Sequence, residues 1–139
     1  MVEAGRTYLI RNKQTGTCLD CNTGNSWVRA WHDKGGQNQK WVLDREGRGH
    51  PWTLRNVETG RFLAPAPEGG DVGPKTPINT SDEPHLWHLS DDGGLLRIQY
   101  PGNHALNIDI EGGSDHNDAV VFLWETGGDN QVWDFVESG

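Results

Sequence analysis

Two stretches of the chain, Trp31-His-Asp-Lys-Gly-Gly-Gln-Asn-Gln-Lys-Trp41 and Trp124-Glu-Thr-Gly-Gly-Asp-Asn-Gln-Val-Trp133, share one pattern of a tryptophan, a glycine pair and a closing Asn-Gln-x-Trp. A further tryptophan, Trp87, lies midway between Trp41 and Trp133, so that the three are spaced 46 residues apart. Self-similarity at a fixed period indicates an architecture of repeated units. We therefore place three repeats, near residues 6–47, 48–92 and 93–139, in one domain covering residues 1–139.

Each repeat has the pattern of about four short strands. Residues 9–16 (LIRNKQTG) match residues 53–60 (TLRNVETG), and residues 97–102 (RIQYPG) form a weaker third copy. Two short apolar segments follow in the first and third repeats, and every repeat ends on its tryptophan strand. About twelve short strands in three equivalent sets are best accommodated by closure into a threefold barrel, which removes exposed sheet edges. We expect the three evenly spaced tryptophans to be equivalent core residues.

Composition and charge exclude several other classes of protein. The chain has 139 residues with 19 Gly and 7 Pro, and these interrupt it too often for a helical bundle, a coiled coil or a membrane span. Twenty acidic against 12 basic residues give a net charge of −8, and no basic cluster is present. Nucleic-acid binding depends on clustered Lys and Arg, so nucleic acid is not an expected partner. An all-β domain remains.

The Asn38-Gln39-Lys40-Trp41 and Asn130-Gln131-Val132-Trp133 strings resemble the QxW signature of the ricin-B-type β-trefoil lectins, above all the small single-domain fungal members. The resemblance covers the whole chain. It implies a β-trefoil with pseudo-threefold symmetry that binds galactose-type sugars. In that family the sugar is held by an Asp early in a repeat, an aromatic ring, and the Asn before the QxW motif.

The residues themselves suit this chemistry in two of the three repeats. Sugar recognition in water needs an acceptor for neighbouring hydroxyls, an amide that both donates and accepts, and a flat ring for the C–H face. The candidate sugar-binding residues are Asp20, Trp31, Lys34, Gly36, Asn38 and Gln39 in the first repeat, and Asp109, Trp124, Asn130 and Gln131 in the third. At the matching positions the second repeat has Ala64, Pro84 and His85, so it keeps Trp87 and lacks the polar set.

Purely structural interpretations compete with these assignments. The aspartates and asparagines could stabilise turns, the tryptophans could pack in the barrel, and the glutamines are expected to bind the backbone. Lys34 and Thr126 precede the glycine pairs, where the fungal lectins often carry His. The third repeat is one residue shorter between Trp124 and its glycine pair, and Asn107 competes with Asp109 for the acceptor position. The first site is therefore the better defined of the two.

No metal, cofactor or catalytic site is expected. The Cys18–Cys21 pair lacks a second pair for zinc, and residues i and i+3 of a strand diverge, which favours ordinary buried thiols over redox or metal roles. The acidic segment 109–118 does not fit a calcium loop. Asp20 and Asp109 belong to different repeats, so they should not form the paired carboxylates of a glycosidase.

We therefore expect a non-enzymatic lectin for terminal galactose or N-acetylgalactosamine-type sugars, with glycans or glycoproteins as partners. Two sites per chain, or a homodimer, would raise its avidity. The main alternative is a β-trefoil protease inhibitor acting through residues 64–71 and 73–77, where Lys75 lies between prolines, or an accessory subunit of a larger protein. Residues 1–6 lack the pattern of a signal peptide, which predicts a cytoplasmic or unconventionally secreted protein without membrane insertion.

Overall fold

The computed structural model describes residues 2–138 and confirms the all-β prediction. Its strands are β1 (Thr7–Asn12), β2 (Cys18–Cys21), β3 (Val28–Trp31), β4 (Lys40–Asp44), β5 (Thr53–Asn56), β6 (Phe62–Pro65), β7 (Ile78–Ser81), β8 (His88–Asp92), β9 (Leu95–Tyr100), β10 (Asn103–Ile110), β11 (Ala119–Glu125) and β12 (Trp133–Glu137). Three short 3-10 turns, η1 (Gln37–Gln39), η2 (Glu111–Gly113) and η3 (Asp129–Gln131), complete the described elements. None of these helices is long and apolar enough to cross a membrane.

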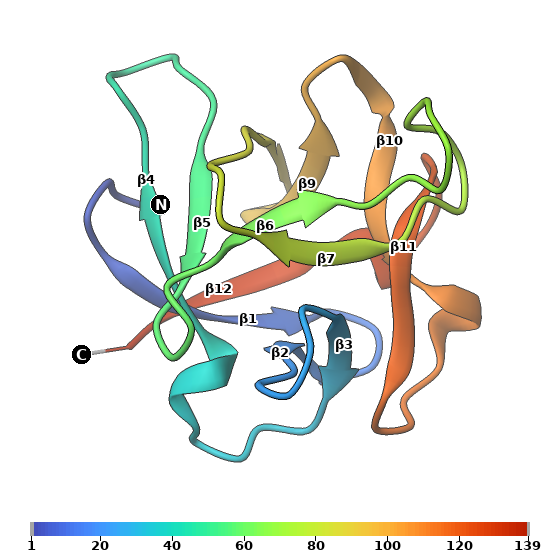
Figure 1. The fold of residues 1–139 in the computed structure, drawn as a ribbon, viewed down its shortest axis with the longest axis horizontal. Coiled ribbons are helices and arrows are strands. Elements are labelled where there is room, and N and C mark those ends of the chain that lie inside the picture. Colours follow the sequence, from blue (N-terminus) through green and yellow to red (C-terminus); the bar gives the residue numbers. More distant parts are fainter. Residues whose placement is uncertain (1, 139) are drawn as a thin grey trace.

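Six of the strands close into a barrel, in which the first and last strands of the chain lie side by side (Figure 1). Antiparallel pairs link β12 to β1, β1 to β4, β4 to β5, β8 to β9 and β9 to β12. A bridge between Trp52 and Trp87 joins the β5 and β8 sides and completes the ring. Strand β1 alternates half-buried and buried residues, as a strand with one face on a core should.

The remaining strands form three hairpins, β2–β3, β6–β7 and β10–β11, which cap one end of the barrel. Each hairpin pairs with the next, and one pair of residues occupies an equivalent position in all three contacts. The three pairs are Trp27 to Asn79, Pro77 to Phe122 and Val120 to Arg29. This cyclic pairing gives the pseudo-threefold symmetry of a β-trefoil, as predicted, and it gives Trp27 a place in the cap.

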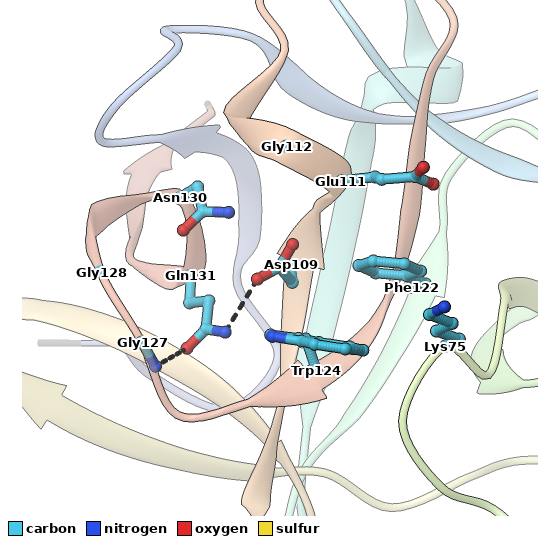
Figure 2. A pocket seen from close by; sticks show the side chains of 10 residues that line it. All are labelled: Lys75, Asp109, Glu111, Gly112, Phe122, Trp124, Gly127, Gly128, Asn130 and Gln131. Carbon is cyan, nitrogen blue, oxygen red and sulfur yellow. Dashed lines mark hydrogen bonds between the residues drawn. The ribbon is translucent and has the colours of Figure 1, made fainter.

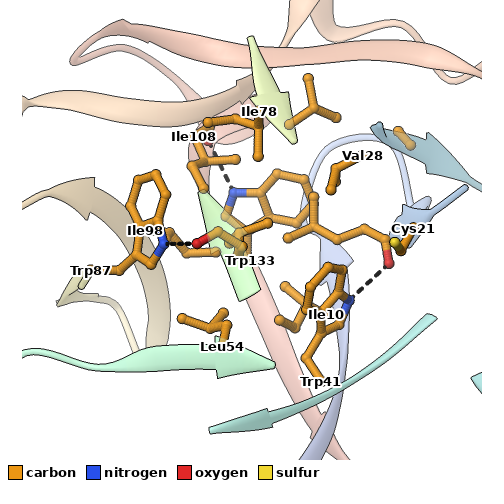
Figure 3. Close-up of a cluster of buried hydrophobic side chains, with 14 of the residues drawn as sticks. Ile10, Cys21, Val28, Trp41, Leu54, Ile78, Trp87, Ile98, Ile108 and Trp133 are labelled. Atoms are coloured by element: carbon orange, nitrogen blue, oxygen red, sulfur yellow. Dashed lines mark hydrogen bonds between the residues drawn. The ribbon is translucent and has the colours of Figure 1, made fainter. Parts of the chain in front are cut away.

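Trp41, Trp87 and Trp133 are fully buried at the centre of the core (Figure 3). Their indole N–H groups donate to the carbonyls of Leu19, Leu63 and Ile108 at 3.1, 2.9 and 3.1 Å. Burial of the large apolar ring is favourable, and pairing of its N–H removes the cost of burying an unpaired donor. The prediction of three equivalent core tryptophans is confirmed.

Cys18 and Cys21 are both fully buried on β2 and both are free thiols. Burial raises the pKa of the Cys18 thiol to about 11 and also raises that of Cys21. A thiol with a raised pKa and no solvent access is a poor nucleophile. Within residues 2–138 no group of His, Cys, Asp or Glu side chains is arranged to hold a metal ion.

Candidate functional site

The two candidate acceptors, Asp20 and Asp109, occupy equivalent positions near the ends of β2 and β10. In each repeat the core tryptophan binds the carbonyl of the residue just before the aspartate, Leu19 or Ile108. This shared contact identifies Asp109, and not Asn107, as the counterpart of Asp20. Asn107 is instead buried and binds Thr126 and the Gln99 side chain.

A glutamine amide fixes each aspartate carboxylate. Gln39 Nε2 lies 3.0 Å from Asp20 Oδ2, and Gln131 Nε2 lies 2.8 Å from Asp109 Oδ2. Both glutamines are buried, at the ends of η1 and η3. Burial raises the pKa of both aspartates above the ordinary value of 3.8, although these hydrogen bonds oppose the rise. Each carboxylate is therefore an oriented acceptor whose charge carries a desolvation cost.

The same glutamines hold the loop that follows each candidate tryptophan. Gln39 donates to the His32 carbonyl at 2.7 Å and accepts from the Lys34 backbone N–H at 2.9 Å. Gln131 donates to the Glu125 carbonyl and accepts from the Gly127 backbone N–H, both at 2.7 Å. The predicted backbone-binding role of the glutamines is thus present, and it is combined with carboxylate positioning.

These bonds also correct the alignment of the two loops. Counting back from the glycine pairs matches Lys34 with Thr126, but the glutamine contacts match Lys34 with Gly127. Gly36 and Gly128 both directly precede the 3-10 turns η1 and η3, so the residue that has no counterpart in the third repeat is Gly35. The two sites differ at the Lys34 position by a whole lysine side chain.

Asn38 and Asn130 also occupy equivalent places, on η1 and η3. Their amides donate to the Cys21 and Ile110 carbonyls at 3.1 and 3.0 Å, and Asn38 donates to Asp20 Oδ1 at 3.1 Å as well. Gly36 lies next to this amide, since a Cβ added there would be 2.7 Å from Asn38 Oδ1. Each asparagine is half-buried, and its side-chain amide lies beside the aspartate of its own repeat.

A cavity of about 430 Å³ lies in the third repeat (Figure 2), within the size range of small-molecule sites. Asp109, Asn130, Gln131 and the exposed ring of Trp124 line it, so the structure brings the predicted residues together. Phe122 stacks with Trp124 at 5.9 Å between ring centroids and an interplanar angle of 15°. The cavity thus offers an oriented carboxylate beside a continuous aromatic surface.

In the first repeat the matching space is used differently. The Lys34 ammonium lies 4.7 Å from the centroid of the Trp31 ring and 3.8 Å from Asp20 Oδ2. Lys34 therefore sits between the ring and the carboxylate, and all six predicted residues of this repeat are gathered in one place. The sequence favoured the first repeat as the better defined site. The structure gathers the predicted residues in both repeats, and those of the third line the cavity of about 430 Å³.

The second repeat keeps the scaffold and loses the polar set. Trp87 binds Leu63, which places Ala64 where the other repeats have their aspartates. Strand pairing puts Ser81 opposite Phe62, at the position where Trp31 lies opposite Cys18. The second repeat therefore lacks the acceptor, as the sequence comparison predicted, and the structure shows that it lacks the ring as well.

Several residues at the third site were not anticipated. Phe122 and Glu111 line the cavity, and so does Lys75, which comes from the second repeat. Arg97 on β9 donates to Gln131 Oε1 at 2.9 Å and to the Gly127 carbonyl at 2.8 Å. Phe122 could have been found from its two-residue spacing to Trp124 on one strand face. Lys75 and Arg97 left no such local signal.

The repeated Arg-Asn-x-x-Thr-Gly segments also contribute to positioning. Asn56 Nδ2 donates to the Asn38 carbonyl at 2.9 Å, and Asn12 Nδ2 donates to the Asn130 carbonyl at 3.0 Å. Each asparagine thereby fixes the backbone of the asparagine in a neighbouring repeat. The signal for this role was visible in the sequence as the match between residues 9–16 and 53–60.

Comparison with solved structures gives whole-length matches. The Macrolepiota procera ricin B-like lectin in complex with lactose is 27% identical, with a TM-score of 0.89 and 99% of each chain covered. The Rhizoctonia solani agglutinin is 22% identical, with a TM-score of 0.87 and 99% of each chain covered. The designed threefold symmetric protein ThreeFoil is 24% identical, with a TM-score of 0.83 over 94% of this chain and 97% of that one.

A search of curated protein sequences finds no significant match. The family model described as ricin-type beta-trefoil lectin domain-like matches residues 2–79 and, in an overlapping second match, residues 37–124. Two overlapping matches are what a repeated sequence should give, since one model can align in more than one register. Together with the barrel, the cap and the three core tryptophans, they show that this chain belongs to the ricin-type β-trefoil lectin family.

Proposed function

We propose that this chain is a non-catalytic lectin that binds terminal galactose or N-acetylgalactosamine-type sugars in its third repeat. The observation that carries the proposal is the cavity in which the Asp109 carboxylate, the Asn130 amide and the Trp124 ring converge. The lactose complex of the similar Macrolepiota procera lectin supports the choice of sugar class. Glycans and glycoproteins are the corresponding partners.

Each group has a separate task in this proposal. Asp109 accepts hydrogen bonds from two neighbouring hydroxyls, because one carboxylate offers several short, charge-assisted acceptor positions. Asn130 completes the polar contact, and the Trp124 ring packs against the apolar C–H face of the sugar. Phe122 extends this apolar surface. A single shallow site of this kind has an expected dissociation constant near the millimolar range, or about −4 kcal/mol.

The absence of catalysis is also part of the proposal. A glycosidase needs two carboxyl groups on either side of the scissile bond, at separations of roughly 5–10 Å. Asp109 and Glu111 both line the cavity, but they are only two residues apart, at the end of β10 and the start of η2. Asp109 is bound to Gln131 through Oδ2, and Asp20 belongs to another repeat. Prolonged incubation with lactose should therefore release no monosaccharide, and release of galactose would contradict this part of the proposal.

The alternative of a protease inhibitor has a weaker basis. A protease groove takes an extended peptide, whereas Lys75 has a φ of 70° and lies in a turn. The Lys75 backbone N–H donates to the Leu123 carbonyl at 2.7 Å, which ties this residue to the third repeat. Its side chain lines the cavity that we assign to the sugar.

A glycan array, run beside a trypsin inhibition assay on the same preparation, tests the function. We expect binding to glycans with terminal galactose-type residues and no inhibition. Competition with free lactose should release the protein from the array, while an equal concentration of mannose should not. Inhibition of trypsin without glycan binding would overturn the proposal.

A further inference from the structure

We propose that Lys34 is an internal occupant of the first-repeat site, so that sugar binding by the native chain is confined to the third repeat. This inference rests on the proposed lectin function. It assigns Lys34 as the residue that determines which of the two sites is open.

The first step concerns where the lysine lies. Its ammonium is 4.7 Å from the centroid of the Trp31 ring and 3.8 Å from Asp20 Oδ2. A sugar bound by this repeat would need the same ring face for its C–H groups and the same carboxylate for its hydroxyls. A cation over an aromatic ring is attracted by the ring quadrupole and a cation near a carboxylate by its charge, so both contacts favour the occupied state.

The second step concerns how firmly the lysine is held. The Lys34 backbone N–H is bound by Gln39 Oε1 at 2.9 Å, and Gln39 Nε2 also binds Asp20 Oδ2 at 3.0 Å. One amide therefore fixes the backbone of the lysine and the carboxylate that its side chain approaches. The occupant is attached to the site itself, which gives it a high effective concentration that no added sugar has.

The third step is an internal control provided by the repeat. Gln131 Oε1 accepts a hydrogen bond from the Gly127 backbone N–H, as Gln39 Oε1 does from the Lys34 backbone N–H. A glycine therefore occupies the matching position of the third repeat. Glycine has no side chain that could reach Trp124 or Asp109, and a cavity of about 430 Å³ is found there. The two repeats share the aspartate, the tryptophan, the asparagine and the glutamine, and they differ at this position.

The test exchanges the two residues. Lys34→Ala removes the side chain and keeps the clamped backbone N–H, whereas Gly127→Lys places a lysine in the third site. A side chain fits at Gly127, because an added Cβ would make only ordinary contacts of 3.6 Å or more and the φ lies outside the left-handed region. Arg48→Ala, in the loop after β4, removes one exposed positive charge away from both sites and serves as the matched control.

Binding at each site is followed by NMR during a lactose titration, using the indole N–H signals of Trp31 and Trp124. Trp31→Phe and Trp124→Phe variants assign these signals. In the native chain and in Arg48→Ala we expect the Trp124 signal to move and the Trp31 signal to stay. In Lys34→Ala the Trp31 signal should also move, with about a three- to tenfold gain in first-site affinity. Gly127→Lys should weaken the third site by a similar factor.

The outcomes separate this inference from the proposed function. Movement of the Trp31 signal in the native chain at the same lactose concentration as Trp124 would overturn the occupant role of Lys34 and leave the lectin intact. A Trp31 signal that stays fixed in Lys34→Ala, with Trp124 still responding, would overturn it as well. If neither signal responds in the native chain or in Lys34→Ala, both the inference and the galactose-type assignment fail.

Discussion

Gln131 donates a 2.8 Å hydrogen bond from Nε2 to Oδ2 of Asp109, at the edge of the third-repeat cavity. Gln131 is the glutamine of the QxW motif, and Asp109 is the residue that we assign as the main sugar acceptor. The equivalent pair in the first repeat, Gln39 and Asp20, is 3.0 Å apart. The glutamine of the motif thus contributes to the site by orienting a buried carboxylate.

Replacing the acceptor should separate binding from stability. We expect Asp109→Asn to weaken lactose binding by at least tenfold, because an amide cannot accept two charge-assisted hydrogen bonds from hydroxyls. The thermal midpoint should stay the same or rise, since burial penalises the charged form of this side chain. Affinity is measured by titration and unfolding by circular dichroism, with the exposed Asp91→Asn as control. A variant that keeps full affinity would contradict the acceptor role.

Sugar binding should be lost on acidification at a pH above the ordinary aspartate value. Burial raises the pKa of Asp109 above 3.8, so the carboxylate protonates earlier than a free one as the pH falls. A raised pKa in the folded state gives a stability contribution that is fully present below the unfolded pKa and is lost as the pH rises through the folded pKa. Acidification should therefore weaken binding without Asp109 itself destabilising the fold.

This pH dependence is measured by lactose titrations from neutral pH down to about pH 3, with circular dichroism at each point. We expect the affinity to fall while the spectrum remains that of the folded protein. Loss of affinity only at a pH below 3.8 would contradict the effect of burial on Asp109. Unfolding that coincides with the loss would show that the carboxylate is not its cause.

The arginine behind the third site should act as a positioning residue. Arg97→Met removes the bonds to Gln131 Oε1 and the Gly127 carbonyl and keeps much of the side-chain length. We expect third-site affinity for lactose to fall by about three- to tenfold, equivalent to roughly 1 kcal/mol, because the glutamine and its loop lose a partner. Arg55→Met, at an exposed position on β5, should leave the affinity unchanged. Equal losses in both variants would argue against a specific role.

The three core tryptophans should be equivalent in energy as well as in position. Phenylalanine at Trp41, Trp87 or Trp133 would remove one buried indole hydrogen bond and leave a cavity. Each substitution should lower the free energy of unfolding by about 2–4 kcal/mol, measured by urea denaturation. Trp27→Phe, at a side chain that is 49% exposed, should cost less than about 0.5 kcal/mol. A cost below about 1 kcal/mol at any core position would break the equivalence.

The thiols of the folded protein should be unreactive. Cys18 and Cys21 are fully buried and burial raises the pKa of both, with that of Cys18 at about 11. A disulfide reagent at about pH 8 should therefore label neither thiol until the protein is unfolded, when both should react. Rapid labelling of either one in the folded state would show that the β2 strand opens locally.

Much of the fold was predictable because the three repeats share recognisable residues at regular spacing in the sequence. The 46-residue spacing of the tryptophans, the matched Arg-Asn-x-x-Thr-Gly segments and the two Asn-Gln-x-Trp strings indicated three equivalent units and a closed barrel. The members of each site could also be named, since Asp, Trp, Asn and Gln recur together in two repeats. Local spacing and chemistry were sufficient for these conclusions.

The difference between the two sites was decided by the tertiary structure. Hydrogen bonds from Gln39 and Gln131 showed that Lys34 corresponds to Gly127, where counting back from the glycine pairs had suggested Thr126. Phe122, Lys75 and Arg97 reach the third site from its own hairpin, from the second repeat and from the barrel. The sequence by itself determined the repeated scaffold and the type of site. Which site is open depends on contacts between side chains that are distant in the sequence, such as Lys34 with Asp20, and the repeat pattern does not predict those contacts.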